Sequence, residues 1–228
     1  MRIKVILDDK LRRKLGVFIA YAIVENVKVM KSDVKVEKFL SKVVEEACKK
    51  FSIDSIKENP IIRAYRDFYW RIGIDPTKQR PSSEALLRRV LRYKGIPLIN
   101  NIVDAGNIAS IETLVPIGIY DIDKIGDDTL ILRYANSGEV FKGIGGKVKV
   151  LRESDIVLAS SKGKILHLYP YRDSVETMIT DDTSNILVIG AGVPNVDKSL
   201  VLKAVEKTVD YVLAFGGGKV TCKPTIVV

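Results

Sequence analysis

The chain has 228 residues and a mass of 25.4 kDa, which is typical of one large domain or of two small joined ones. It is 46% hydrophobic and 29% charged, a composition that excludes disordered, collagen-like and coiled-coil proteins. The formal net charge is +9, and a domain this basic is often matched to a polyanion, although a lysine-rich surface of a heat-adapted protein would give the same charge.

The first 55 residues predict two strands and two helices. Residues 2–7 and 17–29 are rich in β-branched residues, which favour strands, and the charged segment between them predicts a short capped helix. A longer helix is expected after Asp33, because apolar residues recur there every three or four positions. These residues are Val36, Phe39, Leu40, Val43, Val44 and Ala47.

Residues 60–95 predict two further helices with clear boundaries. Pro60 begins the first and Gly73 ends it, while Ser82 begins the second and Gly95 ends it. Proline is favoured at the start of a helix and glycine just past its end.

The pattern changes between Ile117 and Ile189 to short alternating segments separated by turn residues, which predict strands. Residues 197–214 then predict an amphipathic helix, and residues 222–228 a last short strand. Because no linker or repeat divides the chain, we expect a single α+β domain over residues 1–228, with helices first and strands second.

The sequence offers few residues for metal or redox chemistry. Cys48 and Cys222 lack a second ligand at metal-binding spacing, so we expect packing thiols. The single histidine, His167, lies in an alternating stretch that predicts a strand, where a half-buried, hydrogen-bonded side chain is expected. We therefore expect neither a metal nor a cofactor.

Two glycine-containing segments resemble phosphate-binding loops. Gly192–Ser199 would fit such a loop except that Asp197 replaces its second glycine and places a negative charge where a phosphate would lie. Asp197 is expected to cap the following helix instead. Gly143–Lys147 precedes a strand rather than a helix, which favours a bulge or a close approach of the backbone to a ligand.

Positive charge is concentrated in residues 60–95, which hold nine basic and three acidic residues. Most of the basic residues are arginines, whose planar guanidinium binds phosphate through two hydrogen bonds, and aromatic residues lie between them. We interpret the segment as an RNA-binding surface; the alternative is that the aromatics belong to the core and the arginines to its solvated side. The RNA-binding candidates are Arg66, Lys78, Arg80, Arg88, Arg89 and Arg92.

The apolar runs of the sequence are short. None reaches the 18 or so residues that a membrane span needs, and the first residues show no apolar stretch of signal-peptide length. We therefore expect a cytoplasmic protein with no membrane association.

Five motifs resemble the B3/B4 domain, the editing module of the phenylalanyl-tRNA synthetase beta subunit, and especially its free-standing versions. They are Asp75–Arg89, Pro97–Asn107, Pro116–Asp121, Gly143–Lys147 and Tyr171–Leu187.

The resemblance is strongest over residues 60–190, which leaves residues 1–55 as an N-terminal extension of strands and a helix. It implies a three-layer α+β fold with a pocket for the aminoacyl end of tRNA, in which a wrong ester, such as tyrosine on phenylalanine tRNA, is hydrolysed. The chain is too short to include a synthetase active site, so such a domain would act in trans or only bind tRNA.

The resemblance implies a pocket formed by Asn107, Pro116, Gly145 and Gly146. The bacterial synthetase pattern has a histidine, implicated in editing, two residues after that proline, and here Gly118 stands in its place.

Hydrolysis without that histidine is chemically feasible, because an aminoacyl ester is already activated and needs mainly a positioned water and a stabilised oxyanion. The glycine amides could bind the oxyanion, Asn107 or Thr183 could orient the substrate, and Asp104 or Glu112 could act as base. Asp173 and Ser174 are further pocket candidates.

Each of these candidates also has a structural alternative. Asp104 and Asn107, three residues apart, could only cap or bond backbone, Thr183 could only shape its turn, and Asp173 and Ser174 also lie in a turn. Three functions therefore remain open: a trans-editing deacylase, a non-catalytic tRNA- or aminoacyl-recognition module, and an amino acid- or dipeptide-binding protein.

Overall fold

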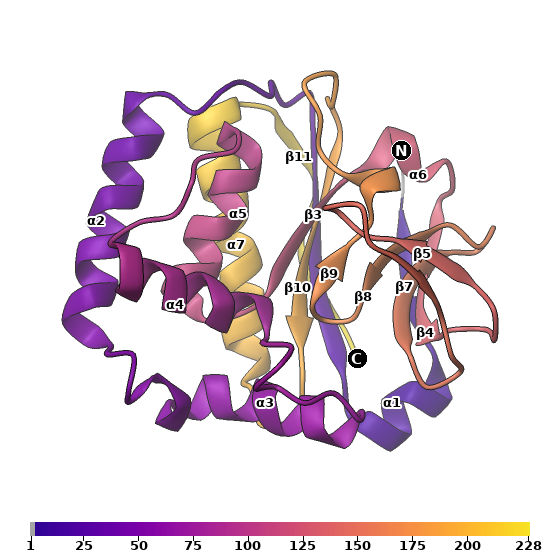
Figure 1. Cartoon of the computed structure of the whole chain (residues 1–228). Helices are drawn as coiled ribbons and strands as arrows, with labels where there is room; N and C mark the ends of the chain where they lie inside the picture. Colours follow the sequence, from indigo (N-terminus) through magenta and orange to yellow (C-terminus); the bar gives the residue numbers. More distant parts are fainter. Residues whose placement is uncertain (1–2) are drawn as a thin grey trace.

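The computed structural model describes residues 3–228, which form three layers (Figure 1). A layer of helices covers one face of a middle sheet, and a second sheet covers the other face. The expected three-layer α+β architecture is confirmed. The helices are α1 (Asp9–Leu15), α2 (Val34–Lys50), α3 (Pro60–Arg71), α4 (Ser82–Tyr93), α5 (Asn101–Thr113), α6 (Ile122–Ile125) and α7 (Lys198–Gly216), with 3₁₀ turns η1 (Ile56–Glu58) and η2 (Val175–Thr177).

The middle sheet is antiparallel throughout and has the strand order β11-β2-β10-β3. Its strands are β2 (Phe18–Glu25), β3 (Ile117–Asp121), β10 (Ile186–Gly192) and β11 (Lys219–Val227).

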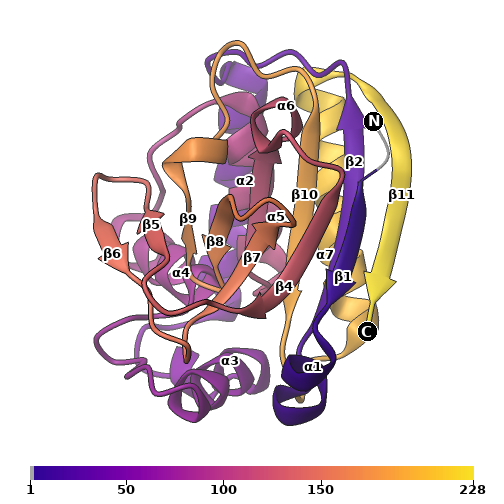
Figure 2. The same cartoon turned by 90° about the vertical axis from the view of Figure 1, so that its right-hand side faces the viewer.

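The outer sheet has the order β1-β4-β7-β8-β9, and Figure 2 shows it from the side on which the β5–β6 hairpin projects. Only its β1–β4 pair is parallel. The strands are β1 (Lys4–Leu7), β4 (Thr129–Tyr134), β7 (Ile156–Ser160), β8 (Ile165–Leu168) and β9 (Arg172–Asp173), and the hairpin consists of β5 (Val140–Lys142) and β6 (Val148–Val150).

The N-terminal strands belong to the two sheets and are not an extension added to them. β2 lies between β11 and β10, and β1 forms one edge of the outer sheet. Six of the eight residues of β2 are buried, because the helix layer covers one face of this strand and the outer sheet covers the other. The division into helices first and strands second is therefore only partly correct, and residue 2 of the first predicted strand lies outside the described residues.

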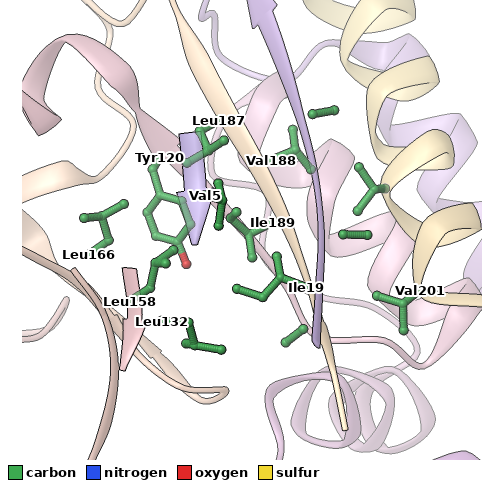
Figure 3. Packing of buried hydrophobic residues seen from close by; sticks show 14 of the residues in the cluster. Val5, Ile19, Tyr120, Leu132, Leu158, Leu166, Leu187, Val188, Ile189 and Val201 are labelled. Carbon is green, nitrogen blue, oxygen red and sulfur yellow. The ribbon is translucent and has the colours of Figure 1, made fainter. Parts of the chain in front are cut away.

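The core lies on both faces of the middle sheet (Figure 3). Successive residues of β10 point to opposite faces, so Val188 lies towards α7 and Leu187 towards the outer sheet. Gly190 lets α7 pack closely, because a β-carbon there would lie 2.8 Å from a methyl group of Val205. The helices are thus fixed directly against the sheet that carries β3 and β10.

The predicted helix boundaries agree with the structure. Asp197 accepts a hydrogen bond of 2.8 Å from the backbone N–H of Ser199 and caps α7, as its position in the sequence indicates. The helices expected at residues 60–73 and 82–95 are α3 and α4. No helix within residues 3–228 has the length and apolar character that a membrane crossing requires.

Candidate functional site

A small cavity lies where α4, α5, the middle sheet and the end of β8–β9 meet. Its volume is about 210 Å³, below the roughly 300–1,000 Å³ of pockets for drug-sized ligands, so it suits a group of amino-acid size. One part of its lining is apolar and the other is polar. The apolar part comprises Leu86, Pro116, Ile117, Pro170, Ile189 and Ala191, and the other lining residues are Ser82, Asn107, Gly118, Tyr120, His167, Tyr171, Arg172 and Asp173.

Four of the candidate residues meet in this cavity although they come from different parts of the chain. Asn107 projects from α5, Pro116 and Gly118 from the start of β3, and Asp173 from β9. The middle sheet and the outer sheet both contribute, so the cavity forms only when the two sheets are packed together.

Three polar side chains form a hydrogen-bonded chain in the cavity wall. The Tyr120 hydroxyl donates to Oδ1 of Asp173 at 2.6 Å and lies 2.7 Å from Nδ1 of His167. Burial raises the pKa of Asp173 to about 6, against the opposing effects of the Tyr120 hydrogen bond and the Arg172 charge. Burial lowers the pKa of His167 to about 3. The cavity therefore combines a carboxyl that titrates near neutrality with an imidazole that stays neutral.

Gly118 stands where the bacterial pattern has a histidine, and the side chain of Tyr120 fills the space beside it. The hydroxyl of Tyr120 lies where a side chain of residue 118 would begin. Glycine is thus required here by the closeness of Tyr120.

A basic hollow lies on another side of α4, with a volume of about 440 Å³. Tyr93 is 69% exposed, and the guanidinium carbon of Arg92 lies 6.0 Å from the centroid of its ring. An exposed aromatic ring beside guanidinium groups is the combination that stacks a base and binds phosphate. The hollow is lined by Gln79, Arg80, Ala85, Arg88, Arg89, Arg92 and Tyr93.

The basic hollow and the small cavity share α4. Ser82 and Leu86 line the small cavity, whereas Arg89 and Arg92 line the hollow. A ligand that occupies both would lie across one helix.

The B3/4 domain family matches residues 64–217, more than half of the chain and the part that contains both sites. The chain belongs to the B3/4 domain family.

Among curated proteins, this B3/4 domain is similar to phenylalanine–tRNA ligase beta subunits. That of Symbiobacterium thermophilum is 32% identical over 111 residues, which are 49% of this chain and 12% of the relative. That of Geobacter metallireducens is 33% identical over 111 residues, 49% of this chain and 14% of the relative. The chain therefore spans only a small part of the length of these relatives.

A solved structure shows the same fold. It is the N-terminal fragment of the phenylalanyl-tRNA synthetase beta subunit from Pyrococcus horikoshii, with a TM-score of 0.53 and 19% sequence identity. The alignment covers 96% of this chain and 50% of that one.

Asp104 of the B3/4 domain is buried outside the cavity lining. It accepts hydrogen bonds from the Ser32 hydroxyl at 2.6 Å and from the Ile99 N–H at 3.1 Å, and burial raises its pKa. The side chain of Asn107 also hydrogen-bonds it. Asp104 thus anchors the segment before α5 and orients Asn107, which agrees with its structural alternative.

Glu112 and Thr183 also lie away from the cavity. Glu112 accepts from Lys207 at 3.1 Å and from the Tyr211 hydroxyl, beside a groove between α2, α5 and α7. Thr183 is buried and donates to Asp121 at 2.6 Å, in the turn before β10. The structure does not bring either residue to the other candidates.

Gly145 and Gly146 lie in the exposed turn between β5 and β6, at φ +90° and +79°. The turn touches β9 instead of lining the cavity: the Ile144 N–H donates to the Asp173 carbonyl at 3.0 Å, and Arg172 donates to the Ile144 carbonyl at 3.1 Å. The glycine turn thus supports two residues that do line the cavity.

Ser174, the last pocket candidate, is buried and does not line the cavity. Its hydroxyl accepts from the Glu176 N–H at 3.1 Å and caps η2. This agrees with the structural alternative for the turn.

Four of the RNA-binding candidates line the hollow: Arg80, Arg88, Arg89 and Arg92. The other two, exposed Lys78 and Arg66 on α3, lie outside its lining. Oε1 of Glu84 lies 2.9 Å from Nη1 of Arg66 and 2.7 Å from Nε of Arg88.

Glu84 is completely buried. Its carboxylate therefore joins α3 to α4 and offsets part of the charge of these two arginines.

Proposed function

We propose that this B3/4 domain binds the acceptor end of a tRNA and hydrolyses the ester of a wrongly attached amino acid. The arrangement of α4 carries the proposal, because this helix presents arginines to the sugar-phosphate backbone on one side and borders an amino-acid-sized cavity on another. Family membership and similarity to phenylalanine–tRNA ligase beta subunits support it.

Asp173 is the best candidate base for the reaction. Its pKa of about 6 is close to the value that favours proton transfer at neutral pH, and it lies in the cavity with Asn107. Water would attack the ester carbonyl, its proton would pass to the Asp173 carboxylate, and the same proton would then reach the departing ribose oxygen. Asn107 would orient the aminoacyl group.

Two binding functions are the alternatives. Gly118 in place of the histidine of the bacterial pattern favours a recognition module without hydrolysis, and the small volume of the cavity suits a free amino acid.

A deacylation panel tests the proposal. Purified protein is incubated with several mischarged tRNAs, including tyrosine on phenylalanine tRNA, and the remaining ester is measured over time. We expect faster loss than in buffer for at least one tRNA, and a rate about tenfold lower or more for Asn107→Ala. Asp181→Ala, on an exposed loop, is the control and should keep the full rate.

If every ester decays at the buffer rate while the tRNAs bind, the recognition module replaces the hydrolase. If tRNA does not bind, a thermal-shift screen with free amino acids decides whether the cavity takes a small molecule.

A further inference from the structure

A further cavity lies where α1 meets the end of α3, beside the turns that follow β4 and precede β7 (Figure 1). Its volume is about 660 Å³, within the roughly 300–1,000 Å³ of small-ligand pockets. We call it the α1–α3 cavity, and its polar lining includes Lys10, Lys14, Arg71, Tyr134, Glu153 and Ser154. It shares no residue with the lining of the small cavity or of the basic hollow, and both lysines precede the residues that the family matches.

Positive charge dominates the lining of the α1–α3 cavity. Lys10 and Lys14 reach it from α1, and Arg71 from the last position of α3. None of these three cations forms an ion pair with a carboxylate of residues 3–228, whereas Arg133 on the adjacent β4 is paired with Glu139 at 2.6 Å. Their charge is therefore available to an anionic ligand.

Arg71 is held in place by the backbone of α1. Its guanidinium donates to the carbonyl of Leu15 at 3.4 Å and to that of Lys14. These carbonyls belong to the end of the helix, whose partial negative charge would repel an anion, and the guanidinium offsets that charge. The remaining N–H groups of the guanidinium are free for a ligand, and the side chain is positioned before one binds.

Lys10 and Lys14 lie four residues apart in α1 and therefore on the same side of this helix. Like charges at this spacing repel each other and destabilise a helix. An anion bound between the two ammonium groups would remove the repulsion. The pair is thus better suited to a bound anion than to an empty cavity.

We propose that the α1–α3 cavity binds a phosphate ester through Lys10, Lys14 and Arg71. The planar guanidinium binds phosphate through two hydrogen bonds, and a phosphate has enough acceptor oxygens to pair with both ammonium groups as well. The phosphate comes either from the backbone of a bound RNA or from a free nucleotide. The proposal does not rest on the deacylation of tRNA, because the cavity is separate from the candidate functional site.

Two hydroxyl groups beside the cations add hydrogen-bond donors for the same ligand. Ser154 is exposed at the cavity, and Tyr134 is half-buried. Burial and the charge of Asp8 raise the pKa of Tyr134, against the opposing charge of Arg71. The tyrosine therefore keeps its proton at neutral pH and can donate it to a phosphate or ribose oxygen.

The RNA arm of the test uses unacylated phenylalanine tRNA, so it does not depend on hydrolysis. Filter binding at several salt concentrations compares the wild type with the double variant Lys10→Ala, Lys14→Ala. We expect the variant to bind more weakly and the slope of log affinity against log salt to fall by about 1.5–2. The control Lys38→Ala, Lys203→Ala removes the same charge from exposed positions and should keep the slope.

The nucleotide arm uses AMP and adenosine, titrated into the same proteins by calorimetry. If free nucleotides are the ligands, the wild type should bind AMP at least about tenfold more tightly than adenosine, which lacks the phosphate. The variant that lacks Lys10 and Lys14 should then lose that preference, and the control should keep it. This arm is decisive even if tRNA does not bind at all.

The two arms together identify the source of the phosphate. A reduced slope without AMP binding assigns the cavity to the RNA backbone, and a lost AMP preference with an unchanged slope assigns it to a free nucleotide. Losses in both arms support a site that either phosphate can occupy. The proposal is overturned if the lysine variant and its control behave alike in both arms.

Glu153→Gln provides a test that a misfolded variant could not pass. Glu153 is the one carboxylate in the lining of the cavity, so removing its charge should strengthen the observed binding by about two- to threefold. Glu206→Gln, at an exposed position of α7, makes the same change elsewhere and should have no effect. Unchanged binding by Glu153→Gln would contradict a phosphate in this cavity.

Discussion

The hydroxyl oxygen of Tyr120 lies 2.1 Å from the point that a β-carbon on Gly118 would occupy, and its ring carbon Cζ lies 2.6 Å from it. Both distances are far below any real contact, so a side chain at residue 118 would displace Tyr120. That displacement would break the hydrogen bonds of Tyr120 to His167 and Asp173. Gly118 and Tyr120 are therefore a matched pair, and the histidine of the bacterial pattern is incompatible with this tyrosine.

Gly118→His should accordingly fail to improve deacylation, and Gly118→Ala should lower the free energy of unfolding by about 1–3 kcal/mol through overpacking. Urea denaturation measures the change. Gly95→Ala is the control, because apart from Gly95 and its two chain neighbours no atom of residues 3–228 lies within 4 Å of its β-position, and it should change stability by less than about 0.5 kcal/mol. If Gly118→Ala and Gly95→Ala change the free energy of unfolding equally, Tyr120 moves aside without a cost in stability.

Glu84→Ala should lower the free energy of unfolding by about 3 kcal/mol, since it leaves two half-buried arginines without their shared carboxylate. Urea unfolding with an unchanged m-value would show that the loss is one of stability. Glu45→Ala removes an exposed ion pair with Lys49, which water and salt screen, and should leave the free energy of unfolding nearly unchanged. A small effect of Glu84→Ala would mean that the arginines find other partners.

The double variant Arg89→Ala, Arg92→Ala should weaken tRNA binding and reduce the slope of log affinity against log salt by about 1.5–2, since two phosphate contacts are lost. Filter binding at several salt concentrations measures the slope. Lys38→Ala, Lys203→Ala removes the same charge from exposed positions on α2 and α7 and should leave the slope nearly unchanged. Equal slopes for the two double variants would assign binding to net charge instead of the hollow.

The sequence predicts the local structure better than the pairing of strands. The Pro81–Ser82 start and the Gly95 stop locate α4 closely, because capping depends on neighbouring residues. The central place of β2 is not predictable in this way, since its partners β10 and β11 follow it by more than a hundred residues and local propensity does not specify them.

The candidate site, like the pairing of the strands, is only partly predictable from the sequence. Motif resemblance names Asn107 and Asp173, which the fold gathers in one cavity, but the role of each remains a prediction. The same resemblance suggests Gly145, whose turn only supports the cavity residues. His167 is expected from its strand to be half-buried and hydrogen-bonded; the hydrogen bond is confirmed, but the side chain is fully buried because the two sheets pack over it. Its partner Tyr120 comes from the other sheet, a proximity that only the packing of the two sheets creates.

The buried His167 should make stability depend on pH in a defined direction. Its pKa is lowered from 6.5 to about 3 by burial, so below pH 6.5 the unfolded chain takes up a proton that the folded chain refuses. Keeping the imidazole neutral therefore costs no stability above pH 6.5, and the free energy of unfolding falls as the pH falls from 6.5 towards 3.

The wild type should therefore lose stability relative to His167→Phe by about 1 kcal/mol per pH unit between pH 6 and 4. Urea denaturation of both proteins across this range gives the difference. Asp173, whose raised pKa acts in the opposite direction, is present in both proteins, so its contribution largely cancels in that difference. Parallel stability curves for the two proteins would show that the imidazole takes up a proton as readily in the folded chain as in the unfolded chain.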